Sequence, residues 1–199
     1  MTSIISKGEA ESSMPEKVEI TASSVFRLLH PMHTVLVTSI EKSGKPNIIT
    51  LAWAMPTSIN PPLVAISISP RRYSHSLIEE TKEFVVNIPT MDILKETFFC
   101  GTVSGRDHDK FKEAELTALL AKKAKPPLIK ECVAHLECKL HSQFETGDHT
   151  IFVGEIVAAH ANKEAFTEAY DLEKAKMIFH LGGKEFATLE SKISRPMPP

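Results

Sequence analysis

A short polar segment of the chain concentrates residues that bind anions. Residues 69–76 read Ser-Pro-Arg-Arg-Tyr-Ser-His-Ser and lie between an apolar run and a stretch with helical character. The first N–H groups of a helix have no partner within the helix, so they are suited to binding phosphate. The hydroxyls of Ser74 and Ser76 would add hydrogen bonds, and Arg71 or Arg72 would add a charge-assisted fork. The alternative interpretation is a solvated loop with an ordinary serine cap.

The helix that follows this segment has two candidate starting points. Ser76 and Glu79 have the spacing of a capping box, in which the serine caps the helix and the glutamate reaches back to the backbone. Ser74 is the competing cap. Either start would place serine hydroxyls beside a bound anion.

The strand before this segment carries a second group of interest, Thr50-Leu51-Ala52-Trp53. A flat heteroaromatic molecule needs backbone donors and acceptors along one edge and an apolar contact on one face. A strand interrupted by Pro56, which cannot donate to a ladder, can offer both. The alternative is that these residues only pack in the core, with Trp53 buried.

A second polar loop, Ser104-Gly105-Arg106-Asp107 followed by Lys110, adds two cations and a glycine. This loop either folds over a ligand or is an exposed loop held by a local pair between Arg106 and Asp107. The pattern alone leaves both interpretations open.

Several function classes are disfavoured by motifs that the sequence lacks. It contains no G-x-G-x-x-G, P-loop or G-x-S-x-G motif, which argues against a Rossmann dehydrogenase, a kinase and a serine hydrolase. The histidines are scattered and no H-E-x-x-H occurs, so no metal site is expected. The net charge of −2 and the pI near 6.5 do not indicate the excess of basic residues that binding to nucleic acid or to an anionic membrane requires.

The cysteines and the apolar runs indicate where the protein resides. The three cysteines are an odd number without a C-x-x-C pair, which favours a reduced protein over a disulfide scaffold. No signal peptide is recognisable, and the longest apolar runs are too short to cross a membrane. We therefore expect a cytoplasmic protein.

The order of elements predicts a mainly β fold, a β-barrel with peripheral helices, because most strands follow one another through hairpins. We expect a polar leader over residues 1–20, one barrel domain over 21–190 and a proline-containing tail over 191–199. The predicted strands are residues 33–40, 47–54, 63–69, 83–88, 131–144, 150–159, 177–181 and 186–189. Helices are predicted over residues 22–29, from Ser74 or Ser76 onward, over 91–100, partly over 112–124, and over 163–175.

These motifs, in this order, resemble the flavin reductase-like family of FMN-binding split-barrel proteins, and its flavoredoxin group in particular. The resemblance runs from about Ala22 to Leu189, nearly the whole chain. The segments that carry it are residues 47–53, 60–64, 73–75, 84–87, 104–106 with 109–111, 147–149 with 151–155, and 180–183.

The resemblance implies a six-stranded antiparallel Greek-key split barrel that works as a homodimer and binds FMN non-covalently. By position, the backbone of Thr50, Leu51, Ala52 and Trp53 would contact the isoalloxazine ring, with Ser67 and Ser69 beneath it. The residues implied around the phosphate and the flanks are Arg71, Arg72, Tyr73, Ser74, His75, Ser76, Asn87, Ser104, Arg106 and His149. A positive group, Arg106, Lys110 or His149, would stabilise reduced flavin.

The expected function is that of an FMN-dependent oxidoreductase. It would be either a flavin reductase that takes electrons from NADH or NADPH, or a flavoredoxin-like electron carrier with a redox protein partner. No side chain is required as acid or base, so no catalytic residue is assigned. The alternative is a non-catalytic module whose barrel holds another phosphorylated ligand, such as pyridoxal phosphate, or haem.

Overall fold

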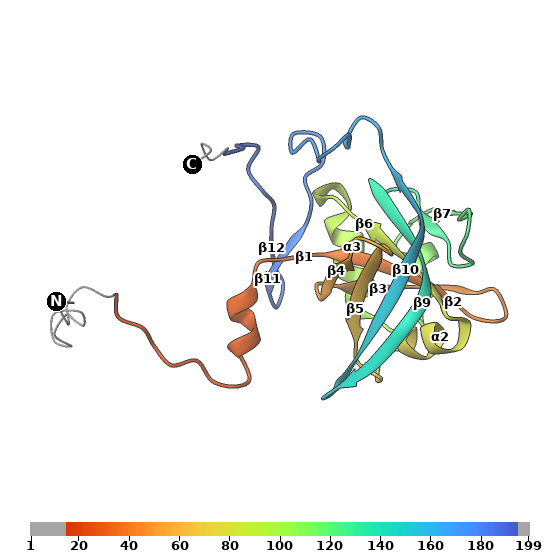
Figure 1. Ribbon diagram of the computed structural model, residues 1–199, viewed down its shortest axis with the longest axis horizontal. Helices are drawn as coiled ribbons and strands as arrows, with labels where there is room; N and C mark the ends of the chain where they lie inside the picture. Colours follow the sequence, from red (N-terminus) through yellow and green to blue (C-terminus); the bar gives the residue numbers. More distant parts are fainter. Residues whose placement is uncertain (1–14, 195–199) are drawn as a thin grey trace. The chain divides into compact units, whose positions relative to one another are not determined.

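The computed structural model describes residues 15–194 and separates the chain into two units, residues 1–30 and 31–199 (Figure 1). The first unit contains a 3-10 helix, η1 (Val25–Leu29), where the sequence predicts a short helix, and none of its residues is buried. Most of the predicted leader, residues 1–14, and the end of the predicted tail, residues 195–199, lie outside the described residues.

The second unit is built on a seven-stranded sheet in the order β3-β2-β6-β9-β10-β5-β4 (Figure 1). Every pairing in it is antiparallel, as predicted. The predicted strand over residues 47–54 is divided at Ala52 and Trp53, which gives one strand more than the expected six. The strands are β2 (Val35–Ile40), β3 (Pro46–Leu51), β4 (Ala54–Ser58), β5 (Leu63–Ile68), β6 (Glu83–Ile88), β9 (Ala134–Thr146) and β10 (His149–Ala161).

The link between β3 and β4 forces this sheet to curl into a barrel. The two strands stand at opposite ends of the sheet, yet only Ala52 and Trp53 separate them. A trans chain reaches at most about 3.6 Å per residue, so Leu51 and Ala54 lie within roughly 11 Å of each other. The ends of the sheet therefore meet without pairing, and we call this unpaired junction the seam.

Two hydrophobic clusters pack against the two faces of the sheet. Successive side chains of a strand point to opposite faces, and on β2 the side chains of Val35 and Val37 join one cluster while that of Leu36 joins the other. The inner cluster fills the barrel with residues that include Ile49, Ile66, Phe84 and Phe152. The outer cluster lies under the helices and consists of Leu36, Ile48, Cys100, Phe111, Ala114, Leu116, Ile129 and Cys132.

The helices and the smaller sheets surround the barrel. The helices are α2 (Tyr73–Thr81), η2 (Met91–Ile93), α3 (Leu94–Thr102) and α4 (Lys110–Glu113). One smaller sheet contains β1 (Met32–His33), β11 (Phe179–Gly182) and β12 (Glu185–Ala187), and the other contains β7 (Ala118–Leu119) and β8 (Leu128–Ile129).

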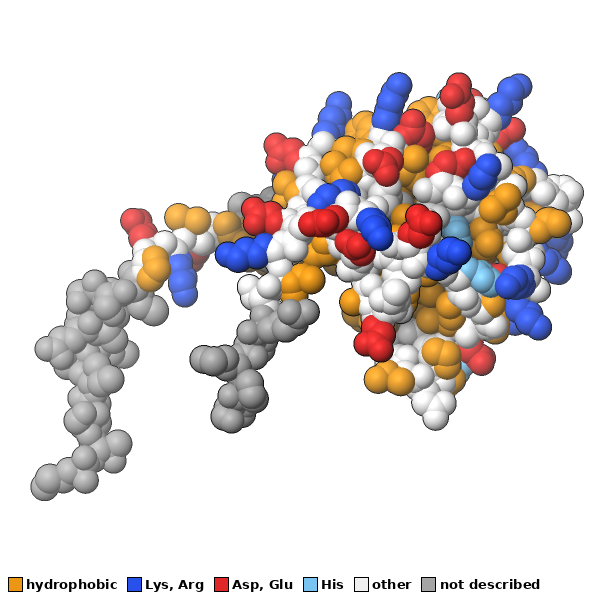
Figure 2. Space-filling model, turned by 90° about the horizontal axis from the view of Figure 1, so that it is seen from above, with side chains coloured by type: hydrophobic (Ala, Val, Ile, Leu, Met, Phe, Trp, Pro, Cys, Tyr) orange, Lys and Arg blue, Asp and Glu red, His pale blue; other side chains and the backbone are white. Residues whose placement is uncertain are grey.

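Within residues 15–194 no helix has the length and apolar character needed to cross a bilayer. Charges of both signs are interspersed over the face shown in Figure 2.

One helix prediction is wrong and another extends too far. Residues 163–175 form turns instead of a helix, because the side chains of Asn162 and Asp171 accept the backbone N–H groups of Glu164 and Glu173. Such local bonds compete with helix formation. The helix predicted partly over residues 112–124 is limited to α4, and Glu115 just after it has a positive φ of 54°.

A buried carboxylate on β9 shapes the loop between β7 and β8. Glu137 is fully buried and accepts hydrogen bonds from the backbone N–H groups of Lys122, Lys123 and Ala124. It also accepts one from His160 Nε2 at 2.8 Å. Burial by itself raises the pKa of Glu137, but these donors outweigh burial and lower the pKa to about 2.

We expect Glu137→Gln to remove much of the acid sensitivity of the fold. A carboxyl group whose pKa falls from 4.5 to about 2 on folding stabilises the protein above pH 4.5, and this contribution is lost as the pH falls toward 2. The contribution is about 3 kcal/mol. Urea unfolding at several pH values measures it. Glu131→Gln is the control, because Glu131 also accepts a backbone N–H, from Thr117. An unchanged slope between pH 4.5 and 2 in Glu137→Gln would contradict this assignment.

Candidate functional site

The polar segment predicted to bind an anion, residues 69–76, leads into α2, and no serine caps this helix. The helix begins at Tyr73, with Arg72 in the N-cap position and no side-chain cap. Ser76 Oγ donates to the carbonyl of Tyr73, and the Glu79 carboxylate accepts from Gln143 Nε2, so the predicted capping box is absent. The first N–H groups of α2 therefore have no side-chain acceptor supplied by a cap.

The side chains of Ser74 and His75 point into the protein. Ser74 Oγ accepts a hydrogen bond from Asn47 Nδ2 at 2.7 Å. His75 Nε2 lies 2.8 Å from Thr150 Oγ1, and its ring packs edge-on against Phe152. Both residues anchor α2 to the barrel, and only their backbone groups remain for an anion.

Three arginines gather around the start of α2. Arg106 Nη1 donates to the carbonyl of Arg71 at 3.4 Å, which joins the second polar loop to the first. The charge of Arg72 acts on Lys110, whereas the charge of Arg71 acts on Asp148. The neighbouring residues Arg71 and Arg72 therefore act electrostatically on different groups.

Tyr73 connects the two loops to the turn that follows β2. Its hydroxyl donates to Glu41 Oε1 at 2.8 Å, and the guanidinium of Arg106 lies over its ring, 4.9 Å from the centroid. The hydroxyl of Ser104 accepts from the backbone N–H of Arg106. Arg106 is thus held by Tyr73 and the Arg71 carbonyl, not by the predicted pair with Asp107.

Gly105 is the residue that allows the second loop to approach the first. A Cβ atom at this position would lie 1.9 Å from Asn47 Oδ1, so every other residue type would displace the loop or Asn47. Asn47 Oδ1 is buried and has no hydrogen-bond partner among the described residues. The contact brings β3, α2 and the second loop together at Asn47.

The backbone of Thr50 faces the seam. Lys110 Nζ donates to the carbonyl of Ile48 at 2.7 Å, so this carbonyl points away from β2. Alternate residues of a strand direct their N–H and C=O groups to the same side. Thr50 therefore offers its backbone groups at the seam, while its hydroxyl donates to the carbonyl of Thr97.

Lys110 holds this edge from a buried position. Its ammonium group also donates to the carbonyl of Cys100 at 2.7 Å, and the residue is only 6% exposed. Burial lowers the pKa of Lys110 to about 8, an effect that Cys100 opposes and Arg72 strengthens. The Lys110 ammonium group thus lies beside the edge of β3 in a buried environment that disfavours its charge.

Trp53 and His149 meet across the intervening strand β5. Trp53 is 37% exposed, so it is not a core residue, and its ring lies 4.8 Å from that of His149. His149 Nδ1 donates to Asp148 Oδ1 at 2.7 Å, and this hydrogen bond is the main cause of the lowered pKa of Asp148. The pair forms an aromatic surface next to the seam.

Asn87, Ser67 and Ser69, which were also predicted at the site, form hydrogen bonds within the protein. Asn87 is fully buried: its Oδ1 accepts from the backbone N–H of Ile129 and lies 2.8 Å from His135 Nδ1. It belongs to the core and does not flank the loops. The N–H of Ser67 donates to the carbonyl of Trp53, and the carbonyl of Ser69 accepts from Arg72. Both serines therefore fix the backbone around the seam.

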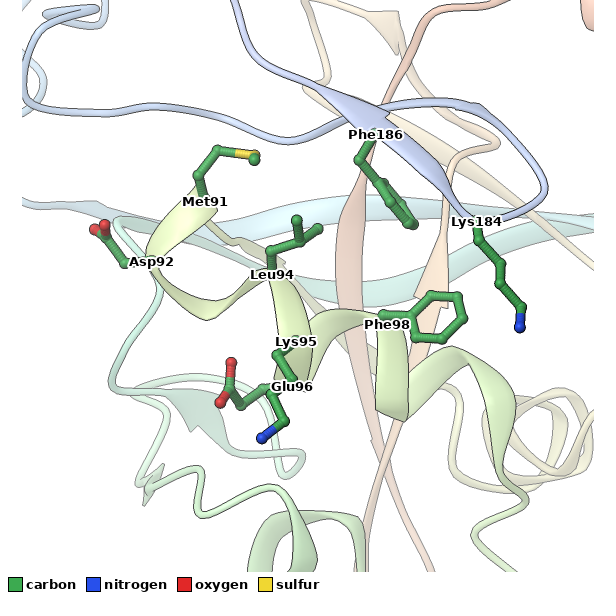
Figure 3. Close-up of a pocket in the computed structure, with 8 residues that line it drawn as sticks. All are labelled: Met91, Asp92, Leu94, Lys95, Glu96, Phe98, Lys184 and Phe186. Atoms are coloured by element: carbon green, nitrogen blue, oxygen red, sulfur yellow. The ribbon is translucent and has the colours of Figure 1, made fainter.

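A separate pocket of about 560 Å³ lies between α3 and β12 (Figure 3). Phe98 and Phe186 form its aromatic wall with ring centroids 6.1 Å apart, and Lys184 lies at its margin. None of its lining residues belongs to the predicted site. Within residues 15–194, no group of three His, Cys, Asp or Glu side chains is placed to hold a metal ion.

Comparison with known proteins identifies the family. Residues 26–182 match the family model described as the flavin reductase like domain. The chain belongs to the flavin reductase-like family. The match covers the whole barrel and both polar loops.

Individual members of the flavin reductase-like family agree with this assignment. An uncharacterised protein of Archaeoglobus fulgidus is 41% identical over 175 residues, which is 87% of this chain and 97% of that protein. A flavin reductase of Pseudomonas putida is 30% identical over 154 residues, or 77% and 82% of the two chains. The crystal structure of flavoredoxin from Methanosarcina acetivorans has a TM-score of 0.81 at 28% identity and covers 91% of this chain and 95% of that one. The predicted split-barrel fold is confirmed.

Sequence reasoning missed three residues that organise the site: Glu41, Asn47 and Asp148. The contacts of Glu41 and Asn47 join segments distant in the sequence, which no local motif reveals, whereas Asp148 bonds to its neighbour His149. The nearest sequence signal was the glycine of the second polar loop, because a glycine between polar residues often marks a close backbone approach.

The contact between Trp53 and His149 predicts that the emission of Trp53 depends on the side chain at position 149. Trp53 is the only tryptophan of the chain, and its ring centroid lies 4.8 Å from that of His149. Removing the imidazole ring exposes more of the indole to water, so His149→Ala is expected to shift the emission to longer wavelength. Steady-state fluorescence of the purified protein measures the shift. His141→Ala, on the same hairpin, is the control and should leave the emission unchanged. An emission spectrum that is the same in His149→Ala as in the parent protein would contradict the contact.

Proposed function

We propose that this protein is an FMN-binding flavoprotein oxidoreductase. The observation that carries the proposal is the seam, where an aromatic pair, outward-facing strand backbone and a cationic helix start come together from separate segments. A flavin mononucleotide needs these three features: an apolar ring contact, hydrogen bonds along one edge, and an anion site for its phosphate.

The donor set at the start of α2 fits a phosphate. The N–H groups of Tyr73 and Ser74 belong to the first turn of a nine-residue helix, and no side chain caps them. Arg72 and Arg106 lie beside this turn. The buried, unpartnered Asn47 Oδ1 lies directly behind it and is a further polar group that a ligand or water can engage. We assign the phosphate to this turn.

The seam fits the ring system. The backbone of Thr50 would supply hydrogen bonds to the ring edge, and Trp53 with His149 would supply the apolar contact. Bound FMN would supply one-electron and two-electron redox chemistry. Lys110, Arg106 and His149 can place positive charge near the ring, which favours electron uptake by a neighbouring group.

We further propose that the protein acts as a homodimer. The outer face of β4, β5, β10 and β9 carries an apolar band that contains Trp53, Met55 and Phe144, all exposed in the single chain. Contiguous exposed apolar surface of this kind is typical of an interface.

The test is a titration of the purified apo-protein with FMN, followed by quenching of flavin fluorescence. We expect about one FMN per chain. Arg72→Ala should weaken binding roughly tenfold or more, because a hydrogen bond to a charged group contributes about 1.5–3 kcal/mol. Lys112→Ala, an exposed cation on α4, is the control and should bind like the parent protein. Absence of FMN uptake would overturn the proposal.

Two further measurements separate the subclasses and the alternative. Rapid anaerobic bleaching of the holo-protein by NADH or NADPH would identify a flavin reductase. Bleaching only by a reduced protein donor would identify an electron carrier of the flavoredoxin type. The absorbance spectrum of the protein as isolated distinguishes flavin from pyridoxal phosphate and from haem, the ligands of the alternative, non-catalytic function.

A further inference from the structure

The pocket between α3 and β12 is formed by two elements, each of which contributes two side chains from one face. Leu94 and Phe98 are four residues apart on α3, so they lie on the same face of the helix. Lys184 directly precedes β12 and Phe186 lies within it, and residues at this spacing share one face of a strand. Glu185, between them, does not line the pocket. The pairing of a helix face with a strand face therefore shapes this pocket.

The wall of this pocket is aromatic. The rings of Phe98 and Phe186 meet edge to face, with an interplanar angle of 82° (Figure 3). Phe186 also packs against His180, its partner across β11 and β12, with ring centroids 5.2 Å apart. Neither phenylalanine is fully buried, so part of each ring remains open to the pocket. Because aromatic rings pack favourably edge to face or offset, this wall suits a flat aromatic molecule.

The size and the remaining apolar lining of the pocket agree with a small ligand. Met91 and Leu94 continue the apolar surface beside the two phenylalanines. The volume of about 560 Å³ lies within the range of roughly 300–1,000 Å³ that is typical of ligand pockets. A molecule with one or two aromatic rings therefore fits.

The charged side chains of the pocket are separated by sign. Figure 3 shows Lys184 beside Phe98, whereas Asp92 and Glu96 lie at the opposite end of the pocket, together with Lys95. Within residues 15–194, Lys184 takes part in no ion pair. An anionic group attached to an aromatic ring is attracted by Lys184 and repelled by the two carboxylates, so a single orientation of such a ligand is favoured.

We propose that this pocket binds a small aromatic carboxylate, with the ring against Phe98 and Phe186 and the carboxylate at Lys184. The inference does not depend on the proposed flavin function, because none of the lining residues belongs to the flavin site. The pocket is nevertheless connected to the seam through α3. The carbonyl of Thr97 on this helix accepts from the hydroxyl of Thr50 at 2.6 Å, so the ligand would lie against the helix that supports Thr50.

The experiment is calorimetry on the full-length protein with 2-naphthoate as the probe. Two matched probes separate the ring from the charge: 2-naphthylmethylammonium has the same ring with the opposite charge, and octanoate is a carboxylate without a ring. We expect one 2-naphthoate to bind per chain, more tightly than either matched probe. The affinity should be the same with and without bound FMN, because the two sites share no residue.

Two variants test the assigned contacts. Lys184→Gln should weaken 2-naphthoate about threefold, the size expected for a partly exposed ion pair, and should remove the preference over 2-naphthylmethylammonium. Phe186→Leu keeps an apolar side chain but removes the ring, so the preference for 2-naphthoate over octanoate should fall about threefold or more. Lys163→Gln removes an exposed lysine outside the pocket and is the control, which should bind like the parent protein.

The outcomes separate this inference from the proposed function. If the parent protein takes up no FMN, the proposed function fails, and calorimetry with 2-naphthoate still tests the pocket. Absence of 2-naphthoate binding, or an unchanged affinity in both Lys184→Gln and Phe186→Leu, would overturn the inference. Displacement of 2-naphthoate by FMN would also overturn it, because the probe would then occupy the flavin site. Tighter binding of octanoate than of 2-naphthoate would reject an aromatic ligand.

Discussion

The short link between β3 and β4 is the constraint on which the rest of the structure depends. Two residues join strands that stand at opposite ends of the sheet, so the sheet has to curl until its ends meet. The junction is left unpaired, and strand backbone that would be hidden in a closed barrel faces outward there. Lys110 then holds this backbone in place by donating to Ile48 and Cys100, which ties β3 to α3 and α4.

Around the seam, contacts between buried side chains fix the positions of the backbone segments. Asn47 binds Ser74 and lies against Gly105, so the start of α2 and the second polar loop are set by one side chain of β3. The hydroxyl of Ser74, which the sequence suggests as a phosphate ligand, is already hydrogen-bonded to Asn47. The arginines and the aromatic pair remain at the surface. This division would suit the proposed flavin site, which has to keep one geometry while the redox group changes charge.

The sequence predicts the fold well because strand patterns are local. β-branched runs separated by turn residues mark β2, β5 and β6, and the polar loop before α2 marks a helix start. Details of the candidate site depend on pairs distant in sequence. The meeting of Trp53 with His149 follows from the register of β4, β5 and β10. Ser74 resembles a cap in the sequence, and its true partner is Asn47 on another strand. The helix predicted over residues 163–175 does not form, which shows that the side chains of Asn162 and Asp171 can outweigh helix propensity.

The unpaired seam also restricts how this chain can change. At the seam, β3 and β4 each have an edge without a neighbouring strand, and such an edge is where a strand from another molecule can add. The link at Ala52 and Trp53 keeps these edges turned toward each other instead of toward neighbouring chains. An insertion there would let the edges separate and would convert the proposed ligand site into a starting point for strand exchange and aggregation. Most surface loops tolerate added residues, whereas this link owes its function to being short.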